Sequence, residues 1–365
     1  PSLVGSEMCI RDSQILLILF FLFGCAQPQS SLPSYDQQLS IDEQKIQNQL
    51  FADSWLKTYQ SFVPIGVDIL YKASDLCETE DIIFGIGIDV ATRYDAPESI
   101  REGINKSLNL TDSLKIVAIG IDSPGYRSGL KVGDEIIKIN GKDAPSGEKA
   151  IFDFYKYVSK KNESNISLKI MRDGHEKDFS ILTESRCRFN YAIDLDNNTF
   201  NAYADGNNIV FSLRMAKWLL QDEIGAAMVF AHELGHNANH HVADKIQNAN
   251  TGALVGLLLG IAIGANPTDA MDLGANIGAT SYSIDYENEA DYLSIYILAL
   301  AGYDISKAPN FWRRFAVEVP NSIYSGGGTH PSTSERFVRL ETYVKEVQDQ
   351  IDKGLKPIPK YKKHK

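Results

Sequence analysis

The stretch FAHELGHNANHH, residues 230–241, places four histidines and one glutamate in twelve positions of a segment with an otherwise apolar helical pattern. His232 and His236 are four residues apart, so on a helix they lie on one face, about 6 Å apart along the axis. Two imidazoles at that spacing can share one tetrahedral zinc ion. Glu233 is rotated by about 100° from His232, which places its carboxylate beside a bound metal. Glu233 is therefore a candidate general base for activating water.

The surroundings of this motif favour a metal site over a chance match. The flanking residues are small and apolar, and two histidines and a glutamate would be costly there without a ligand. A catalytic zinc also needs a third protein ligand and an open position. The segment SIDYENEADYLSIYILALAGYD, residues 283–304, offers acidic side chains at the start of another predicted helix. Its apolar stripe does not choose between Glu287 and Glu289. We interpret His240 and His241 as surface or helix-end residues.

Three further segments carry a resemblance to a known family. They are ENEAD (287–291), FNAYADGNNIVFS (200–212) and THPSTSERFVRL (329–340). With HELGH, they make the chain from about Cys187 to Val347 similar to the gluzincin metallopeptidases of family M48. The resemblance implies one Zn²⁺ per chain with Glu287 as its third ligand, and it leaves Glu289 as a solvated or structural carboxylate. It also implies that Asp291 orients a ligand histidine without binding the metal.

The same resemblance implies roles around the cleft. Asn201 and Ala202 would lie on a strand at the cleft edge and pair with extended substrate. His330 would approach the metal or stabilise the tetrahedral oxyanion, and Arg336 would also support the transition state. A His-Pro turn that caps the last helix is the alternative for His330. We expect neither the four-helix membrane scaffold of some family branches nor the helical-repeat tail of another, because no matching segment accompanies these motifs.

The region before this segment has short β-like runs and glycine turns. A DG pair at 173–174 predicts a hairpin. SPGYRSGLKVGDEIIKING, within residues 114–142, resembles a PDZ domain. Such domains add an extended peptide to their sheet and hold its C-terminal carboxylate on backbone N–H groups. By this resemblance the carboxylate loop lies in FGIGI and comprises Gly85, Ile86, Gly87 and Ile88. An ordinary strand that contains glycine is the alternative.

The N-terminal residues and the cysteines indicate export. ILLILFFLF, residues 15–23, is long enough for a signal-peptide core but too short to span a bilayer. LFGC resembles a bacterial lipobox, which makes Cys25 the predicted lipidation site. In an exported protein the two remaining cysteines of the fold, Cys77 and Cys187, favour a disulfide. It would close a loop worth roughly 4–5 kcal/mol in the chain-entropy model. Two unrelated buried thiols are the alternative.

Charge and glycine spacing add two expectations. The formal net charge of -11 argues against nucleic-acid binding. The tail Lys353–Lys365, with six lysines and no acid, is predicted to be a disordered, solvated end, with an acidic surface as its alternative partner. GALVGLLLGIAIG, residues 252–264, has glycine at every fourth position, which allows two helices to approach closely. It predicts a buried helical hairpin, with contact to a membrane surface or a gating element as alternatives.

We therefore expect an α+β protein with a mainly helical zincin-type peptidase domain, a small edge sheet and a preceding PDZ β-sandwich or barrel. The expected function is a zinc endopeptidase that faces the periplasm, is lipid-anchored to the outer or inner membrane, and acts on proteins or peptides in envelope quality control. A lipoprotein scaffold or chaperone with a latent zinc site is the alternative. The predicted segments are a leader with signal peptide (1–25, of which 1–13 resemble artefact), a tether (26–45), a helical segment interrupted near Pro64 that packs on the catalytic domain (46–77), the PDZ domain (78–185), the peptidase domain (186–350) and a basic tail (351–365).

Overall fold

The computed structural model describes residues 30, 32–159, 164–197, 199–222, 224–263, 265–280, 283–324 and 331–360. The described residues divide into two compact units, with the boundary between Ile46 and Gln47. The predicted leader, the predicted lipidation site Cys25 and the predicted oxyanion residue His330 lie outside the described residues. No described helix has both the length and the apolar content needed to cross a bilayer.

The first long element is helix α2 (Gln37–Lys72), which begins inside the predicted tether. The Asp36 carboxylate accepts a hydrogen bond of 2.7 Å from the backbone N–H of Gln38. Because no glycine or proline follows before Pro64, nothing in the sequence stops the helix. The predicted interruption of the helix at Pro64 is wrong, because α2 continues through this residue. Residues on both sides of this proline are buried, and their packing offsets the roughly 3 kcal/mol that an interior proline costs.

The PDZ region is built on an antiparallel sheet with the order β2-β3-β4-β6-β7 and β5 paired to β4. The predicted DG hairpin joins β6 to β7, and both of its turn residues have positive φ, as a type I′ turn requires. Helix α5 packs on the buried sheet face through Phe154. The elements are β2 (Ile88–Ala91), α3 (Arg101–Leu108), β3 (Lys115–Ile119), α4 (Pro124–Ser128), β4 (Glu135–Ile139), β5 (Lys142–Asp143), α5 (Ala150–Val158), β6 (Asn165–Arg172) and β7 (His175–Leu182).

The two ends of the PDZ region meet at one place. Strand β1 (Ile82–Gly85) pairs antiparallel with β8 (Glu184–Cys187). Next to this pair, Cys77 and Cys187 form a disulfide with their Cα atoms 5.9 Å apart. The chain therefore enters and leaves the PDZ region through one covalently closed junction.

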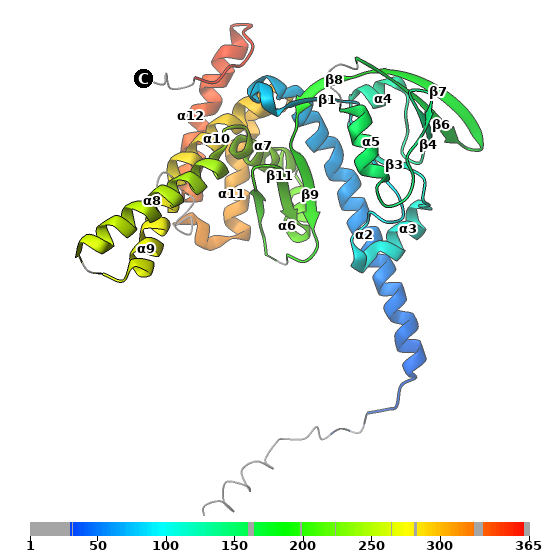
Figure 1. Ribbon diagram of the computed structural model, residues 1–365, viewed down its shortest axis with the longest axis horizontal. Coiled ribbons are helices and arrows are strands. Elements are labelled where there is room, and N and C mark those ends of the chain that lie inside the picture. The colour runs from blue at the N-terminus through cyan, green and yellow to red at the C-terminus, as the bar shows by residue number, and fades with distance from the viewer. Residues whose placement is uncertain are drawn as a thin grey trace, which may run out of the picture. The chain divides into compact units, whose positions relative to one another are not determined.

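The peptidase region is mainly helical with a small sheet at its edge, as the sequence predicts (Figure 1). In the sheet, β11 lies between β9, its parallel neighbour, and β10, its antiparallel neighbour. All fourteen residues of α7 are buried. The elements are β9 (Asn190–Asp194), β10 (Ala202–Ala204), β11 (Asn208–Ser212), α6 (Leu213–Leu219), α7 (Gly225–Ala238), α8 (His241–Ile263), α9 (Pro267–Thr280), α10 (Ser283–Leu300), α11 (Ala308–Glu318) and α12 (Thr333–Asp352).

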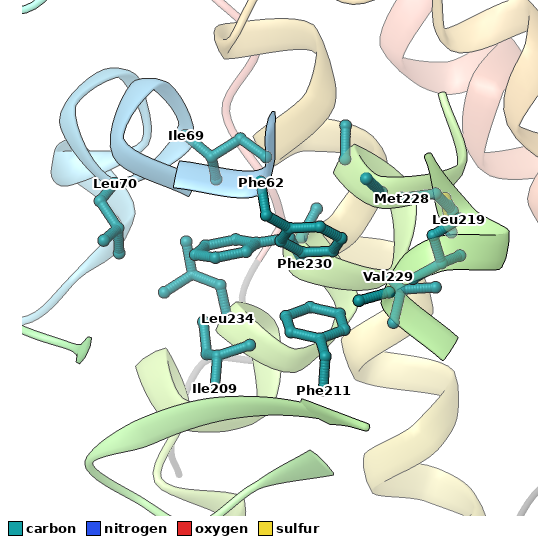
Figure 2. Packing of buried hydrophobic residues seen from close by; sticks show 14 of the residues in the cluster. Phe62, Ile69, Leu70, Ile209, Phe211, Leu219, Met228, Val229, Phe230 and Leu234 are labelled. Atoms are coloured by element: carbon teal, nitrogen blue, oxygen red, sulfur yellow. The ribbon is translucent and has the colours of Figure 1, made fainter. Parts of the chain in front are cut away.

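Figure 2 shows how α2 is joined to the helix that carries HELGH. The rings of Phe62, Phe211 and Phe230 form a layer between α2, β11 and α7. Gly66 lies so close to this layer that a Cβ atom there would be 2.6 Å from the Phe230 ring. The apolar residues of α2 therefore fix one side of the helix that carries HELGH.

The predicted helical hairpin is formed by α8 and α9, but the prediction that it is buried is wrong. Its glycines allow close contact, since a Cβ at Gly256 would lie 2.2 Å from the backbone oxygen of Ala270. The two helices contact mainly each other, and the hairpin projects from the rest of the peptidase region (Figure 1). Its apolar side chains are consequently left in solvent, and Leu258, Leu259, Ile261, Leu273 and Ile277 are between 59% and 63% exposed.

The basic tail is more ordered than predicted up to residue 360. The backbone N–H of Lys360 donates to the Tyr292 hydroxyl over 3.1 Å, and its ammonium group lies 3.2 Å from Glu346. Lys356 pairs with Asp75. Acidic partners on the folded body thus hold part of the tail, while residues 361–365 lie outside the described residues.

Candidate metal centre

Three side chains from α7 and α10 converge on one point. His232 Nε2 lies 3.2 Å from His236 Nε2 and 3.3 Å from a Glu287 carboxylate oxygen, and His236 Nε2 lies 3.4 Å from the other Glu287 oxygen. Zinc bonds of 2.0–2.1 Å in a tetrahedron separate neighbouring ligand atoms by roughly 3.3–3.4 Å. All three side chains are buried. His232, His236 and Glu287 could therefore hold a metal ion, and the structure selects Glu287 over Glu289 as the acidic member.

Asp291 and Arg336 both contact the Nδ1 atom of His232. The Nδ1 atom of His232 lies 2.9 Å from an Asp291 oxygen, and Asp291 is fully buried. Burial and Arg336 act to lower the pKa of His232, but hydrogen bonds to Asp291 and Glu287 outweigh them and raise it to about 9. Burial would raise the pKa of Asp291, yet Arg336 and His232 lower it. Asp291 is therefore an ionised acceptor that fixes the His232 ring, and metal binding at Nε2 would expel a proton from it.

Arg336 makes contacts that its predicted role does not require. Its Nε and Nη2 atoms donate to the two oxygens of Asp291 over 2.8 Å and 2.5 Å. Its guanidinium also lies 3.4 Å from the ring centre of Trp312. Only 6% of the side chain is exposed. Through these contacts Arg336 holds Asp291 in place, and Asp291 in turn orients His232. The Arg336 side chain also lines the adjoining cleft.

The second histidine, His236, has its own supporting residue, His241, which lies at a helix end as predicted, at the start of α8. His241 is not a surface residue but is 1% exposed, and its Nδ1 atom lies 3.0 Å from His236 Nδ1. Its Nε2 atom lies 3.3 Å from Glu289, and its ring stacks on Tyr286. If His236 binds a metal through Nε2, its Nδ1–H donates to His241, which then donates to Glu289. Burial lowers the pKa of His236 to about 4 against its bond to Glu287, which keeps the ring neutral.

Helical periodicity concealed the role of His241. On a continuous helix it would lie about 140° from His236 around the axis, and so on another face. Helix α7 instead ends at Ala238, and His240 takes a positive φ of 54°. This left-handed residue turns the chain so that the next side chain reaches back to the metal centre. A histidine five positions after a ligand histidine was the only signal in the sequence.

Glu233 lies beside the three converging side chains, on a cleft of about 500 Å³. Asn201, Ala202 and Pro331 line the same cleft. Ala202 begins β10, which is the outer strand of its sheet, with Ala202 opposite Phe211 of β11. An outer strand can pair with one more extended chain. The cleft therefore brings together the Glu233 carboxylate, the candidate metal ligands and a strand edge.

The predicted carboxylate loop of the PDZ region borders a second cavity of about 390 Å³. Gly85, Ile86, Gly87 and Ile88 line it together with α5, and residues of α2 and β9 also contribute. Within it, Tyr59, Tyr155 and Tyr191 donate to the Asp89 carboxylate over 2.7, 3.3 and 2.8 Å. Burial and then Asp89 raise the pKa of all three hydroxyls, so they stay protonated as donors. No pattern in the sequence predicted this cluster.

Comparisons with known proteins identify two domains. Residues 178–344 match peptidase family M48, and residues 85–183 match the PDZ domain. A mitochondrial metalloendopeptidase OMA1 of Schizosaccharomyces pombe is 27% identical over 41% of this chain and 45% of its own length. A putative beta-barrel assembly-enhancing protease of Vibrio cholerae is 36% identical over 27% of this chain and 22% of its own length. The chain thus spans less than half of either relative. The PDZ domain of HtrA3 bound to a phage-derived ligand is 23% identical, with a TM-score of 0.22, over 28% of this chain and 88% of its own.

Proposed function

We propose that this chain, which carries an M48 peptidase domain behind a PDZ domain, is a zinc-dependent endopeptidase of the cell envelope. The observation that carries the proposal is the convergence of His232, His236 and Glu287 beside Glu233 on one cleft. Two imidazoles and one carboxylate are the ligand set of a known class of catalytic zinc sites. Bound zinc would supply a water molecule of pKa near 7 and would polarise the scissile carbonyl.

The protein's own residues account for the other steps. The outer edge of β10 aligns an extended substrate through backbone hydrogen bonds, which places a peptide carbonyl over the metal centre. Glu233 takes a proton from the attacking water and delivers it to the leaving amine. Arg336 and Asp291 hold His232, and Glu289 and His241 hold His236, so that both ligand rings keep one orientation. His330, beyond the described residues, remains our candidate for the oxyanion.

The proposal also includes a location in the cell envelope and a role for the PDZ domain in binding substrates. Two relatives are named for beta-barrel assembly, and the apolar run before Cys25 suits a lipid-anchored exported protein. A PDZ domain supports binding of protein or peptide ends. The cavity bordered by Gly85–Ile88 has room for a peptide end, and Ile86 and Ile88 give it apolar walls. We therefore propose that the chain captures C-termini of envelope proteins for quality control.

Glu233→Gln tests the catalytic proposal. The variant should keep its zinc and lose cleavage of casein or of an unfolded envelope protein, because the amide cannot accept the proton. Glu341→Gln, exposed on α12, is the matched control and should cleave like the wild type. Cleavage at the wild-type rate by Glu233→Gln would show that the mechanism is wrong. Complementation of a deletion strain by this variant would instead favour a scaffold or chaperone with a latent site.

The PDZ proposal has a separate readout. Fluorescence anisotropy with a peptide that ends in an apolar residue should show saturable binding, and amidation of its C-terminus should abolish it. Equal binding of the free acid and the amide would show that the loop does not hold a carboxylate.

A further inference from the structure

A second group of metal-ligand side chains lies outside the centre described above. It comprises Glu78, Glu80 and His240, whose ligand atoms all lie within 4.8 Å of one another. Glu78 and Glu80 follow the disulfide residue Cys77, at the start of the PDZ region. His240 is the left-handed residue between α7 and α8. The group therefore joins two segments that are far apart in sequence.

Asp81 provides an independent sign of a ligand at this place. Its side chain is 2% exposed, and one carboxylate oxygen, Oδ1, accepts a hydrogen bond from Arg188. The other oxygen, Oδ2, is buried and accepts no hydrogen bond from the described residues. It lies 3.5 Å from His240 Nε2, so it points into the group. A buried carboxylate oxygen without a donor is costly, and a cation would satisfy it.

Two distances from His240 are close to those of the first centre. His240 Nε2 lies 3.4 Å from a Glu78 oxygen and 3.5 Å from Asp81 Oδ2. Ligand pairs of the first centre are separated by 3.2 to 3.4 Å. Bonds of 2.0–2.1 Å to one tetrahedral ion give roughly 3.3–3.4 Å. His240 is thus spaced as a co-ligand from both Glu78 and Asp81, and a Glu80 oxygen lies within 4.8 Å of the ligand atoms of Glu78 and His240.

Charge and ligand type indicate which ion. Glu78, Glu80 and Asp81 bring three negative charges, and Arg188 returns one positive charge. The remaining excess of negative charge suits a divalent cation. One imidazole beside carboxylates favours Zn²⁺ or Mn²⁺ over the oxygen-preferring Ca²⁺ and Mg²⁺.

We propose that Glu78, Glu80, Asp81 and His240 form a second divalent-cation site of the zinc or manganese type. Glu78, Glu80 and His240 would supply three ligands, and the buried Asp81 oxygen that lies 3.5 Å from His240 would supply the fourth. Four protein ligands would leave a tetrahedral ion without an open position. The ion ties the disulfide-closed junction of the PDZ region to the turn after α7. Because His241 follows His240 directly, the same ion stabilises the turn that brings His241 to His236. This inference does not depend on peptidase activity.

Metal counting tests the site. The Glu233→Gln protein, used to prevent self-cleavage, is stripped with chelator, dialysed against micromolar free Zn²⁺ and analysed for zinc per folded chain. We expect two zinc ions per chain, and one after His240→Ala. The double variant His232→Ala/His236→Ala should also keep one, and the combination of all three changes should keep none. Loss of a direct ligand should weaken binding by more than the roughly 10- to 100-fold caused by losing an outer partner.

A second variant and a second measurement guard against misfolding. Glu80→Gln changes an exposed side chain and should lose the same zinc ion while keeping the far-UV circular dichroism of the parent. Glu98→Gln, an exposed glutamate elsewhere in the PDZ region, should keep both ions. Added Zn²⁺ or Mn²⁺ should raise the Tm of His232→Ala/His236→Ala, and His240→Ala should remove that rise. A zinc-free His232→Ala/His236→Ala protein, or unchanged zinc content in folded His240→Ala and Glu80→Gln proteins, would overturn the proposal.

Discussion

Replacing Arg336 by methionine should destabilise the fold and the metal centre together. Asp291 is fully buried, and its two strongest partners are the Nε and Nη2 atoms of Arg336 at 2.8 and 2.5 Å. Without Arg336, the buried carboxylate keeps only His232 as a charged partner among the described residues. Breaking a buried ion pair on one side costs about 3–5 kcal/mol. That is a large fraction of the roughly 5–15 kcal/mol that stabilises a typical domain.

The same change should reach the metal centre through His232. The ring would lose part of the contact that fixes its orientation, and the loss of an outer partner lowers metal affinity by roughly 10- to 100-fold. Urea unfolding in the presence of chelator gives the free-energy cost without the contribution of bound metal. Competition with a chromophoric chelator then gives the affinity.

Arg339→Met is the matched control, one turn further along α12. Arg339 pairs with Glu335, and both side chains are more than 40% exposed. Such a surface pair contributes about 0–1 kcal/mol. Combining Arg336→Met with Asp291→Asn should cost less than the sum of the two single changes, because the uncompensated charge is gone. An Arg336→Met cost no larger than that of Arg339→Met, with unchanged metal affinity, would refute the reasoning.

Three further changes have defined outcomes. Replacing Cys77 and Cys187 by serine should cost about 2–5 kcal/mol in urea unfolding, and dithiothreitol should make the wild type match the variant but leave the variant unchanged. His241→Ala, compared within a His240→Ala background, should lower the remaining zinc affinity roughly 10- to 100-fold, whereas an unchanged affinity in chelator competition would remove His241 from the centre. Gly66→Ala should cost about 1–3 kcal/mol, because the new Cβ would lie 2.6 Å from a buried phenylalanine ring of α7. An unchanged Tm would show that the contact between α2 and α7 can relax.

The sequence was most informative where a short local pattern was sufficient to predict the structure. The spacing of HELGH predicts that His232 and His236 share a helix face and that Glu233 lies beside it, and α7 has this arrangement. The DG pair predicts its hairpin from the backbone angles that only a few residues adopt. The glycine interval predicts the pairing of α8 with α9. The HELGH and DG predictions depend on residues that are close together in the sequence. The glycine prediction depends only on the absence of a side chain.

Local patterns failed where the deciding partner lay elsewhere. Pro64 signals the end of a helix, yet packing on both sides carries α2 through it. The apolar composition of 252–264 signals burial, but burial needs a third surface, and the hairpin has mainly its own two helices. The sequence pattern also could not decide whether Glu287 or Glu289 is the third metal ligand, because both flank the apolar stripe of their helix at similar angles.

The sequence by itself determined the candidate chemistry of this protein: two imidazoles and a candidate carboxylate base on one helix, with a PDZ-like region before it. Only the tertiary structure decided which distant side chains serve that chemistry. Arg336 reaches Asp291 across 45 residues of sequence, and His241 reaches His236 only because the chain reverses at His240. Periodicity reports the direction of a side chain relative to its own helix. It does not report what another element places opposite it, and buried charges depend on that partner.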